Sequence, residues 1–110
     1  MSMDKLTDRE LTALKKLKAL LSRDFKLVEL RLFGSKARGD ADRESDMDVL
    51  IVLEDYDWET QKAVFGLCFE ISLECGVLVA PILYSQSEFN SALTRATPFY
   101  EAVTREGVLV

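Results

Sequence analysis

The chain has 110 residues, 48% of them hydrophobic and 30% charged, which is the size and composition of one globular domain. Its formal net charge of −5 argues against nucleic-acid binding through a general basic surface. The absence of histidine excludes a histidine-based triad, an imidazole base and a histidine-ligated zinc site, so any chemistry rests on oxygen ligands, hydroxyls, basic side chains or cysteine.

The N-terminal third of the chain predicts a helix followed by a strand. The segment MSMDKLTDRE lacks the apolar core of a signal peptide. Thr7-Asp8-Arg9-Glu10 is a capping box, and the leucines that follow at helical spacing predict a helix from Asp8 to Ser22. Residues from Leu27 to Phe33 alternate as in a strand, on which Glu29 and Arg31 are expected to form a surface salt pair.

The middle of the chain predicts a turn, a buried strand and a long helix. Lys36 to Ser45 is a polar connection, expected to form one helical turn and then a loop. Asp46 to Leu53 reads as a strand that is apolar after an acidic start. Asp55 and Asp57 offer N-caps for a helix from Trp58 to Glu74, with Gly76 as its C′ residue. Its predicted inner face comprises Val64, Phe65, Cys68 and Ile71.

The two cysteines, Cys68 and Cys75, lie two turns apart on this predicted helix. That spacing is about 10 Å, too long for a disulfide. Two small core residues in a reducing compartment are therefore expected. No apolar stretch of the sequence approaches the roughly 20 residues that span a bilayer. Together these features predict a cytoplasmic protein without a membrane segment.

The C-terminal third predicts a third strand and short helices. Val77 to Tyr84 reads as a strand, and Pro81 places it at a sheet edge or a bulge. A short helix follows, capped by Ser85 or Ser87 and running through Arg95. Another helix opens at Pro98 and ends at Gly107, before an apolar tail. The element order predicts an α/β (α+β) fold, a single domain over residues 1–110 in which helices pack on a small mixed sheet.

Apolar side chains near the C-terminus leave two alternatives open. They either pack internally or form a surface through which the chain self-associates, as a homo-oligomer, or binds a partner protein. These residues are Phe99, Tyr100, Val103, Val108 and Leu109.

Gly34 and Ser35 stand between a predicted strand and a predicted helical turn. Backbone N–H groups at such a position can bind phosphate, and glycine lets the backbone approach a ligand closely. The Ser35 hydroxyl adds a donor, and Lys36 and Arg38 add positive charge beside it. A Gly-Ser turn with basic neighbours is also common in ordinary loops, so these residues alone do not establish a nucleotide site.

Asp46 and Asp48 stand two residues apart at the start of a predicted strand. Their side chains therefore project from the same face, where the two carboxylates repel each other unless a cation lies between them. Oxygen ligands at this spacing suit Mg²⁺, which takes one or two carboxylates and completes its shell with water and phosphates. A solvated strand entry is the alternative explanation of an isolated Asp-x-Asp pair.

The stretch LFGSKARGDADRESDMDVLIVL, residues 32–53, combines both features. A Gly-Ser pair, ten intervening residues, an Asp-x-Asp pair and an apolar strand resemble the minimal nucleotidyltransferases of the DNA polymerase β-type superfamily. The resemblance implies a nucleotidyltransferase fold. It implies that Gly34 and Ser35 bind the β- and γ-phosphates of ATP or another NTP, that Asp46 and Asp48 hold Mg²⁺, and that Arg38 neutralises phosphate charge.

One part of the family's pattern is missing. The resemblance implies a third carboxylate on the strand after the long helix, which completes the site of the metal ion that activates the acceptor hydroxyl. The corresponding positions here, Leu78 and Ala80, are apolar. The nearest acid by topology, Glu29, is better explained by its pairing with Arg31. The two-ion site is therefore expected to be incomplete.

The resemblance also implies a biological setting. Minimal nucleotidyltransferases are paired with helical HEPN-type proteins in toxin–antitoxin systems, where the transferase is the antitoxin. One hypothesis is therefore a protein that transfers a nucleotidyl group, expected to be AMP, to an acceptor held by such a partner. The alternative is a non-catalytic antitoxin with a degenerate nucleotide site, and a third is an α/β domain in which the two motifs are coincidental.

Overall fold

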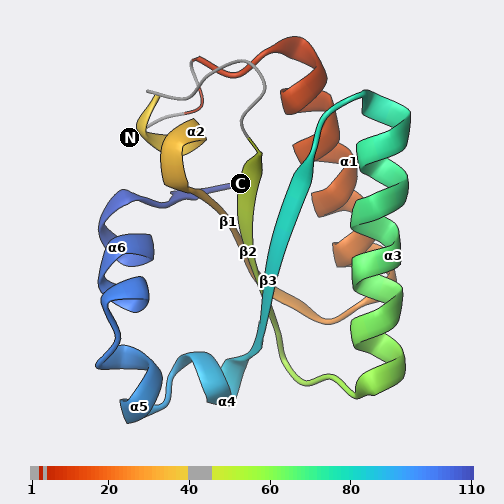
Figure 1. The fold of residues 1–110 in the computed structure, drawn as a ribbon. Coiled ribbons are helices and arrows are strands. Elements are labelled where there is room, and N and C mark those ends of the chain that lie inside the picture. The colour runs from red at the N-terminus through yellow and green to blue at the C-terminus, as the bar shows by residue number, and fades with distance from the viewer. Residues whose placement is uncertain (1–2, 4, 40–45) are drawn as a thin grey trace.

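The computed structural model describes residues 3, 5–39 and 46–110. In chain order the elements are α1 (Asp8–Asp24), β1 (Leu27–Phe33), α2 (Gly34–Arg38), β2 (Met47–Leu53), α3 (Trp58–Cys75), β3 (Val79–Ser85), α4 (Gln86–Phe89), α5 (Ala92–Arg95), α6 (Pro98–Glu106) and β4 (Val108–Leu109). The predicted α/β class with a small mixed sheet is confirmed (Figure 1).

The strands form one sheet in the order β3-β2-β1-β4. β1 is antiparallel to both β2 and β4, whereas β2 and β3 run parallel and are connected through α3. Antiparallel pairing places the end of β1 beside the start of β2, where Phe33 is the partner of Asp48. The parallel register then places Ala80 of β3 on the other side of Asp48.

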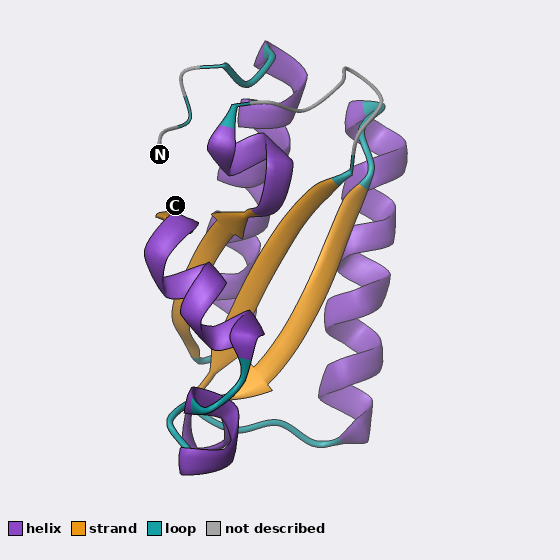
Figure 2. Cartoon of the chain, turned by 60° about the vertical axis from the view of Figure 1, so that its left-hand side comes forward, coloured by secondary structure: helices purple, strands orange, loops and turns teal. Residues whose placement is uncertain are grey.

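Helices cover both faces of the sheet (Figures 1 and 2). α1 and α3 pack on one face, where the main core contains Leu14, Leu17 and Leu21 from α1 and Val64, Cys68 and Ile71 from α3. On the other face, Leu50 and Val52 of β2 pack with Phe89 and Val103. β2 is consequently buried from both sides, which explains its nearly continuous apolar sequence.

Several local signals in the sequence have the predicted structural effect. Thr7 and Glu10 form the capping box of α1, and Gly76 ends α3 in the left-handed conformation at φ 67°. Glu29 pairs with Arg31 at 2.9 Å, and both cysteines are free thiols. Pro81 lies on β3, at the edge of the sheet, and its backbone nitrogen faces away from β2. Its missing N–H therefore costs no ladder bond.

Other predicted boundaries were wrong. α2 begins at Gly34 rather than at Lys36, β2 begins at Met47, and β3 runs from Val79 to Ser85. The helix predicted to end at Arg95 is two short helices, because Ser91 supplies a second N-cap. The part of the predicted connection that covers residues 40–45 lies outside the described residues.

The prediction for Phe65 needs correction, and the burial of the C-terminal apolar residues bears on the two alternatives left open for them. Phe65 is not on the inner face of α3 but is 39% exposed. Of the five C-terminal apolar residues, Val103 is buried and Phe99, Tyr100 and Val108 are partly buried, which leaves Leu109 as the exposed one. Internal packing therefore accounts for most of this segment. Within the described part of the chain, none of the helices combines the length and apolar character needed to cross a bilayer.

Candidate functional site

The centre of the candidate site is the contact between Gly34 and Asp48. Gly34 is the first residue after β1 and has φ +73°, a left-handed conformation that side chains with a Cβ rarely adopt. A Cβ added at Gly34 would lie 2.5 Å from Oδ2 of Asp48. Glycine is therefore required at this position for two reasons: its backbone angle, and the space that the Asp48 carboxylate occupies.

Asp46 and Asp48 form a charged pair at the start of β2. Asp46 is exposed just before the strand, and Asp48 is partly buried within it. Burial raises the pKa of Asp48, and the negative charge of Asp46 raises it further, whereas Arg38 acts in the opposite direction. The chain thus keeps two like charges close together, an arrangement that a bound cation would relieve.

The basic residues of α2 occupy two different environments. Lys36 is buried, and its Nζ lies 2.6 Å from Oε2 of Glu10 in α1. Arg38 is more exposed, and its Nη1 lies 3.3 Å from Oε2 of Glu106 in α6. Each side chain has a further interaction beyond these ion pairs. The two contacts hold α2 against α1 and α6, so that the orientation of Gly34 and Ser35 depends on the whole domain.

The start of α2 differs from the start of the other helices. α1, α3, α4, α5 and α6 follow a Thr, Asp or Ser whose side chain accepts a hydrogen bond from a backbone N–H of the first turn. α2 follows Phe33, whose side chain makes no such bond. Ser35, the second residue of α2, is partly exposed. The first N–H groups of α2 therefore lack a side-chain cap, beside the two carboxylates.

No third carboxylate joins this pair in the described residues. Ala80 is the partner of Asp48 on β3, and Leu78 precedes that strand and is exposed. Glu29 is the partner of Val52, toward the far end of β1. Outside residues 1, 2, 4 and 40–45, no group of three or more Asp, Glu or Cys side chains is placed to hold a metal ion. Asp46 and Asp48 could serve as oxygen ligands of one cation, and such ligands suit Mg²⁺ when phosphates complete its shell.

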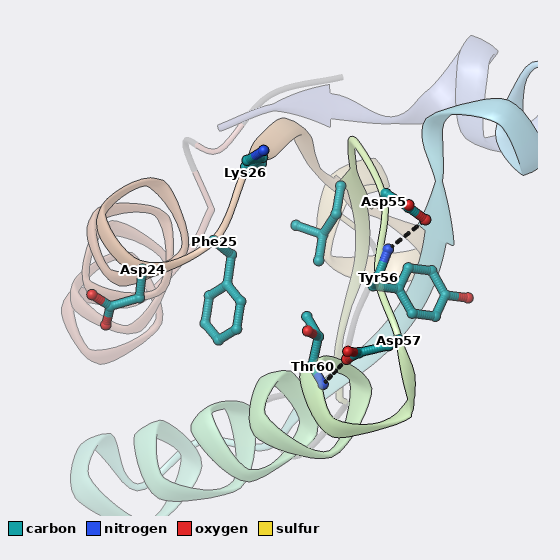
Figure 3. A pocket seen from close by; sticks show the side chains of 8 residues that line it. Asp24, Phe25, Lys26, Asp55, Tyr56, Asp57 and Thr60 are labelled. Carbon is teal, nitrogen blue, oxygen red and sulfur yellow. Dashed lines mark hydrogen bonds between the residues drawn. The ribbon is translucent and has the colours of Figure 1, made fainter.

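A separate cavity of about 380 Å³ lies at the opposite end of β2 (Figure 3). The three acidic residues in its lining already have intramolecular roles. Asp57 accepts the Thr60 N–H at the start of α3, and Asp55 accepts the Tyr56 N–H. Asp24 is held by Arg23. These aspartates cap and connect elements, so the cavity does not compete with the Gly34–Asp48 end as a candidate site.

Sequence reasoning missed Glu10 and Glu106 as neighbours of the site. Glu10 has an evident role in the capping box, and nothing in its local sequence indicates a second role with Lys36. Glu106 precedes the glycine that ends α6 and is distant in sequence from Arg38. Both ion pairs join elements that are far apart in the chain. The one signal in the sequence is that each pair has an acidic residue in the first or last turn of a helix.

Comparison with known proteins agrees with this geometry. Residues 14–103 match the model of the nucleotidyltransferase domain family. A protein of Methanocaldococcus jannaschii, MJ0604, provisionally named a protein adenylyltransferase, is 37% identical over 74% of this chain and 76% of its own length. A solved structure provisionally described as a minimal nucleotidyltransferase has a TM-score of 0.59 at 26% identity, covering 96% of this chain and 98% of that chain.

A toxin–antitoxin crystal structure with AMP-PNP has the same fold, with a TM-score of 0.60 at 22% identity over 94% of this chain and 72% of that chain. Since the family model covers most of the sequence and includes the Gly-Ser turn and the Asp-x-Asp pair, this chain belongs to the nucleotidyltransferase domain family.

Proposed function

We propose that this protein binds ATP as its magnesium complex at the Gly34–Asp48 end of the sheet and transfers AMP to a partner protein. The observation that carries the proposal is the contact of Gly34 with Asp48. It joins the turn that would bind phosphate to the carboxylates that would bind the metal ion. Because ATP is an intracellular substrate, the proposed activity belongs in the cytoplasm.

Each residue of the site has a chemical role in this proposal. Asp46 and Asp48 would hold Mg²⁺, which when bound neutralises triphosphate charge and polarises the phosphoryl group. Backbone N–H groups after Phe33 and the Ser35 hydroxyl would donate to phosphate oxygens. Arg38 would add a positive charge near those oxygens, since it already acts on Asp48. Lys36 would contribute mainly by holding α2 in place through Glu10.

Calorimetry of nucleotide binding tests this proposal. Asp46→Asn and Asp48→Asn should each lose most of the Mg²⁺-dependent affinity for ATP, because each removes one of two carboxylate ligands. Asp24→Asn is the matched control, since Asp24 is an exposed acid of α1 near the opposite end of β2. Equal ATP affinity in the wild type and both site variants would remove the basis for a nucleotide site here.

The partner that we propose is a HEPN-type toxin, with this chain as its antitoxin. The structural neighbour solved with AMP-PNP is itself part of a toxin–antitoxin complex, which supports this setting. In this proposal the toxin supplies the acceptor hydroxyl. Co-purification with the product of a neighbouring gene, followed by labelled-ATP transfer onto it, tests the assignment.

The second candidate function is neutralisation of the toxin by binding alone. The position of Ala80 favours it, because this residue stands beside Asp48 where a third carboxylate would complete a two-ion site. In this case nucleotide binding would stabilise the antitoxin without transfer. The two candidates differ in whether label from ATP appears on the partner.

A further inference from the structure

An apolar stripe runs along the outer surface of α3. It consists of Trp58, Phe65, Phe69 and Leu73, which are 64%, 39%, 65% and 68% exposed. Their spacing of seven, four and four residues places them on one side of the helix, away from the buried Val64, Cys68 and Ile71. α3 lies at the margin of the molecule beside the edge strand β3 (Figures 1 and 2).

The three aromatic side chains supply most of the exposed apolar area of the stripe. An aromatic side chain carries about 150–250 Å² of surface, so the three aromatic residues together expose on the order of 300–400 Å². Leu73 enlarges this patch. The largest apolar patch on a monomeric protein has about this extent and is often functional.

The adjacent edge strand does not favour strand addition by a partner. The carbonyl of Leu78 accepts the Met47 N–H, so the backbone groups of Leu78 face β2. Backbone groups alternate in direction along a strand, so those of Val79 and Pro81 face away from β2. The Val79 N–H is donated to Oγ of Ser72, and Pro81 has no N–H. A partner at this side would therefore contact the side chains of α3 rather than extend the sheet.

The two ends of the stripe differ in shape. Trp58 projects at the N-terminal end, whereas a cavity of about 480 Å³ adjoins Leu73 at the C-terminal end, between α3 and the start of α1. These ends lie about 22 Å apart along the helix axis. An antiparallel second copy would bring Trp58 of each chain to the cavity of the other. A two-fold axis would then pass near Gly66, where a Cβ would meet no atom within 4 Å.

The charges on α3 favour the same orientation. In an antiparallel pair centred near Gly66, Lys62 of one chain lies opposite Glu70 of the other, and Phe65 lies against the open surface at Gly66. A parallel pair would instead bring Lys62 next to Lys62. Lys62 already lies 5.7 Å from the centre of the Trp58 ring, so the cation belongs to the stripe. Opposite charges at matching positions specify partner orientation in helix pairs.

We propose that this protein forms a symmetric dimer in which α3 packs antiparallel against α3 of a second copy. The interface lies on the outer surface of α3, whereas the Gly34–Asp48 site lies at the end of the sheet where β1 ends and β2 begins. The proposal is independent of the function proposed above, because neither Asp46 nor Asp48 belongs to the stripe.

Sedimentation velocity at micromolar concentration tests the dimer. The wild type should sediment as a dimer, and Phe69→Glu should sediment as a monomer with an unchanged circular dichroism spectrum, because Phe69 is mostly exposed. Leu93→Glu is the matched control: Leu93 is 83% exposed on α5, outside the stripe, and its variant should remain dimeric. A monomeric wild type, or a dimer insensitive to Phe69→Glu, would overturn the proposal.

Chemical cross-linking tests the orientation. Gly66→Cys, in a Cys75→Ser background, should give a covalent dimer with a short bismaleimide, since the two thiols would flank the two-fold axis. Ala19→Cys, on the exposed side of α1, should give little. Equal cross-linking of the two variants would contradict the antiparallel arrangement. If the wild type is a monomer and Phe69→Glu abolishes binding of the cognate toxin, the stripe is the toxin-binding surface. This result would overturn the dimer.

Discussion

One carboxylate, that of Glu10, connects the start of α1 to Lys36 in the candidate nucleotide site. Its Oε1 accepts the Thr7 N–H at 2.8 Å and closes the capping box, while its Oε2 lies 2.6 Å from the Lys36 ammonium. Both charged side chains are buried. The pair thus ties the five-residue helix α2 to the main core, although α2 is too short to be stable by itself.

Breaking this pair should be costly. Glu10→Gln keeps the size of the side chain but leaves the Lys36 ammonium buried without its carboxylate, which we expect to lower the free energy of unfolding by about 2–3 kcal/mol. Urea denaturation measures this loss. The double variant with Lys36→Met should recover part of it, because it also removes the buried ammonium that lost this carboxylate. Additive losses in the double variant would show that the pair is not coupled.

The Glu10–Lys36 pair also predicts a pH dependence. Burial by itself raises the pKa of Glu10, but hydrogen bonds from Lys36 and from the Thr7 N–H outweigh it, and the pKa of Glu10 lies below its usual 4.5. The resulting stabilisation is present above the unfolded-state pKa and is lost as the pH falls through the lower folded-state pKa. Thermal melts from pH 7 down to pH 3 should show a smaller acid-induced loss of stability in Glu10→Gln than in the wild type.

Gly34→Ala should damage the site in two ways. The left-handed backbone costs about 1–2 kcal/mol with a Cβ present, and that Cβ would displace the Asp48 carboxylate. We expect lower stability together with loss of Mg²⁺-dependent ATP binding. Gly39→Ala is the matched control, because Gly39 has φ +80° but its Cβ would meet the flexible Lys5 side chain at 3.1 Å. If both variants bind ATP equally, the Gly34–Asp48 contact has no role in binding.

Asp48→Asn should make the ligand-free protein more stable while removing the effect of magnesium. Burial and the charge of Asp46 both disfavour the Asp48 carboxylate, so the neutral amide relieves repulsion in the folded state. A melting temperature a few degrees above that of the wild type is expected without metal. Adding Mg²⁺ with ATP should raise the melting temperature of the wild type only. A destabilised Asp48→Asn protein would mean that Arg38 already neutralises the pair.

Ala80→Asp tests whether catalysis is limited by the missing ligand. Neighbouring strands lie about 4.8 Å apart, so an aspartate at this position would stand next to Asp48. If a third carboxylate is what the site lacks, labelled-AMP transfer to the partner should rise by about 10²-fold or more. Ala80→Asn has nearly the same size without the charge and should not show the gain. Rapid transfer by the unaided wild type would show that Ala80 does not limit the enzyme.

The sequence by itself determined the features that depend on local chemistry. The Thr7–Glu10 capping box predicted the start of α1, and the alternation from Leu27 to Phe33 predicted β1 with its correct bounds. The Gly-Ser turn followed by Asp-x-Asp predicted the family through its resemblance to the minimal nucleotidyltransferases, and the match to the family model confirms it. Caps, alternation and motifs involve residues close together in the chain, so a linear pattern records them.

Only the tertiary structure decided what depends on contacts between distant segments. The strand order and the parallel register placed Ala80 beside Asp48, and packing of α1 against α2 turned Glu10 into the partner of Lys36. The same packing left Phe65 outside the core, on the side of α3 that faces away from Val64, Cys68 and Ile71. Which side of an element is covered depends on where the other elements lie, and hydrophobic spacing within one helix does not contain that information.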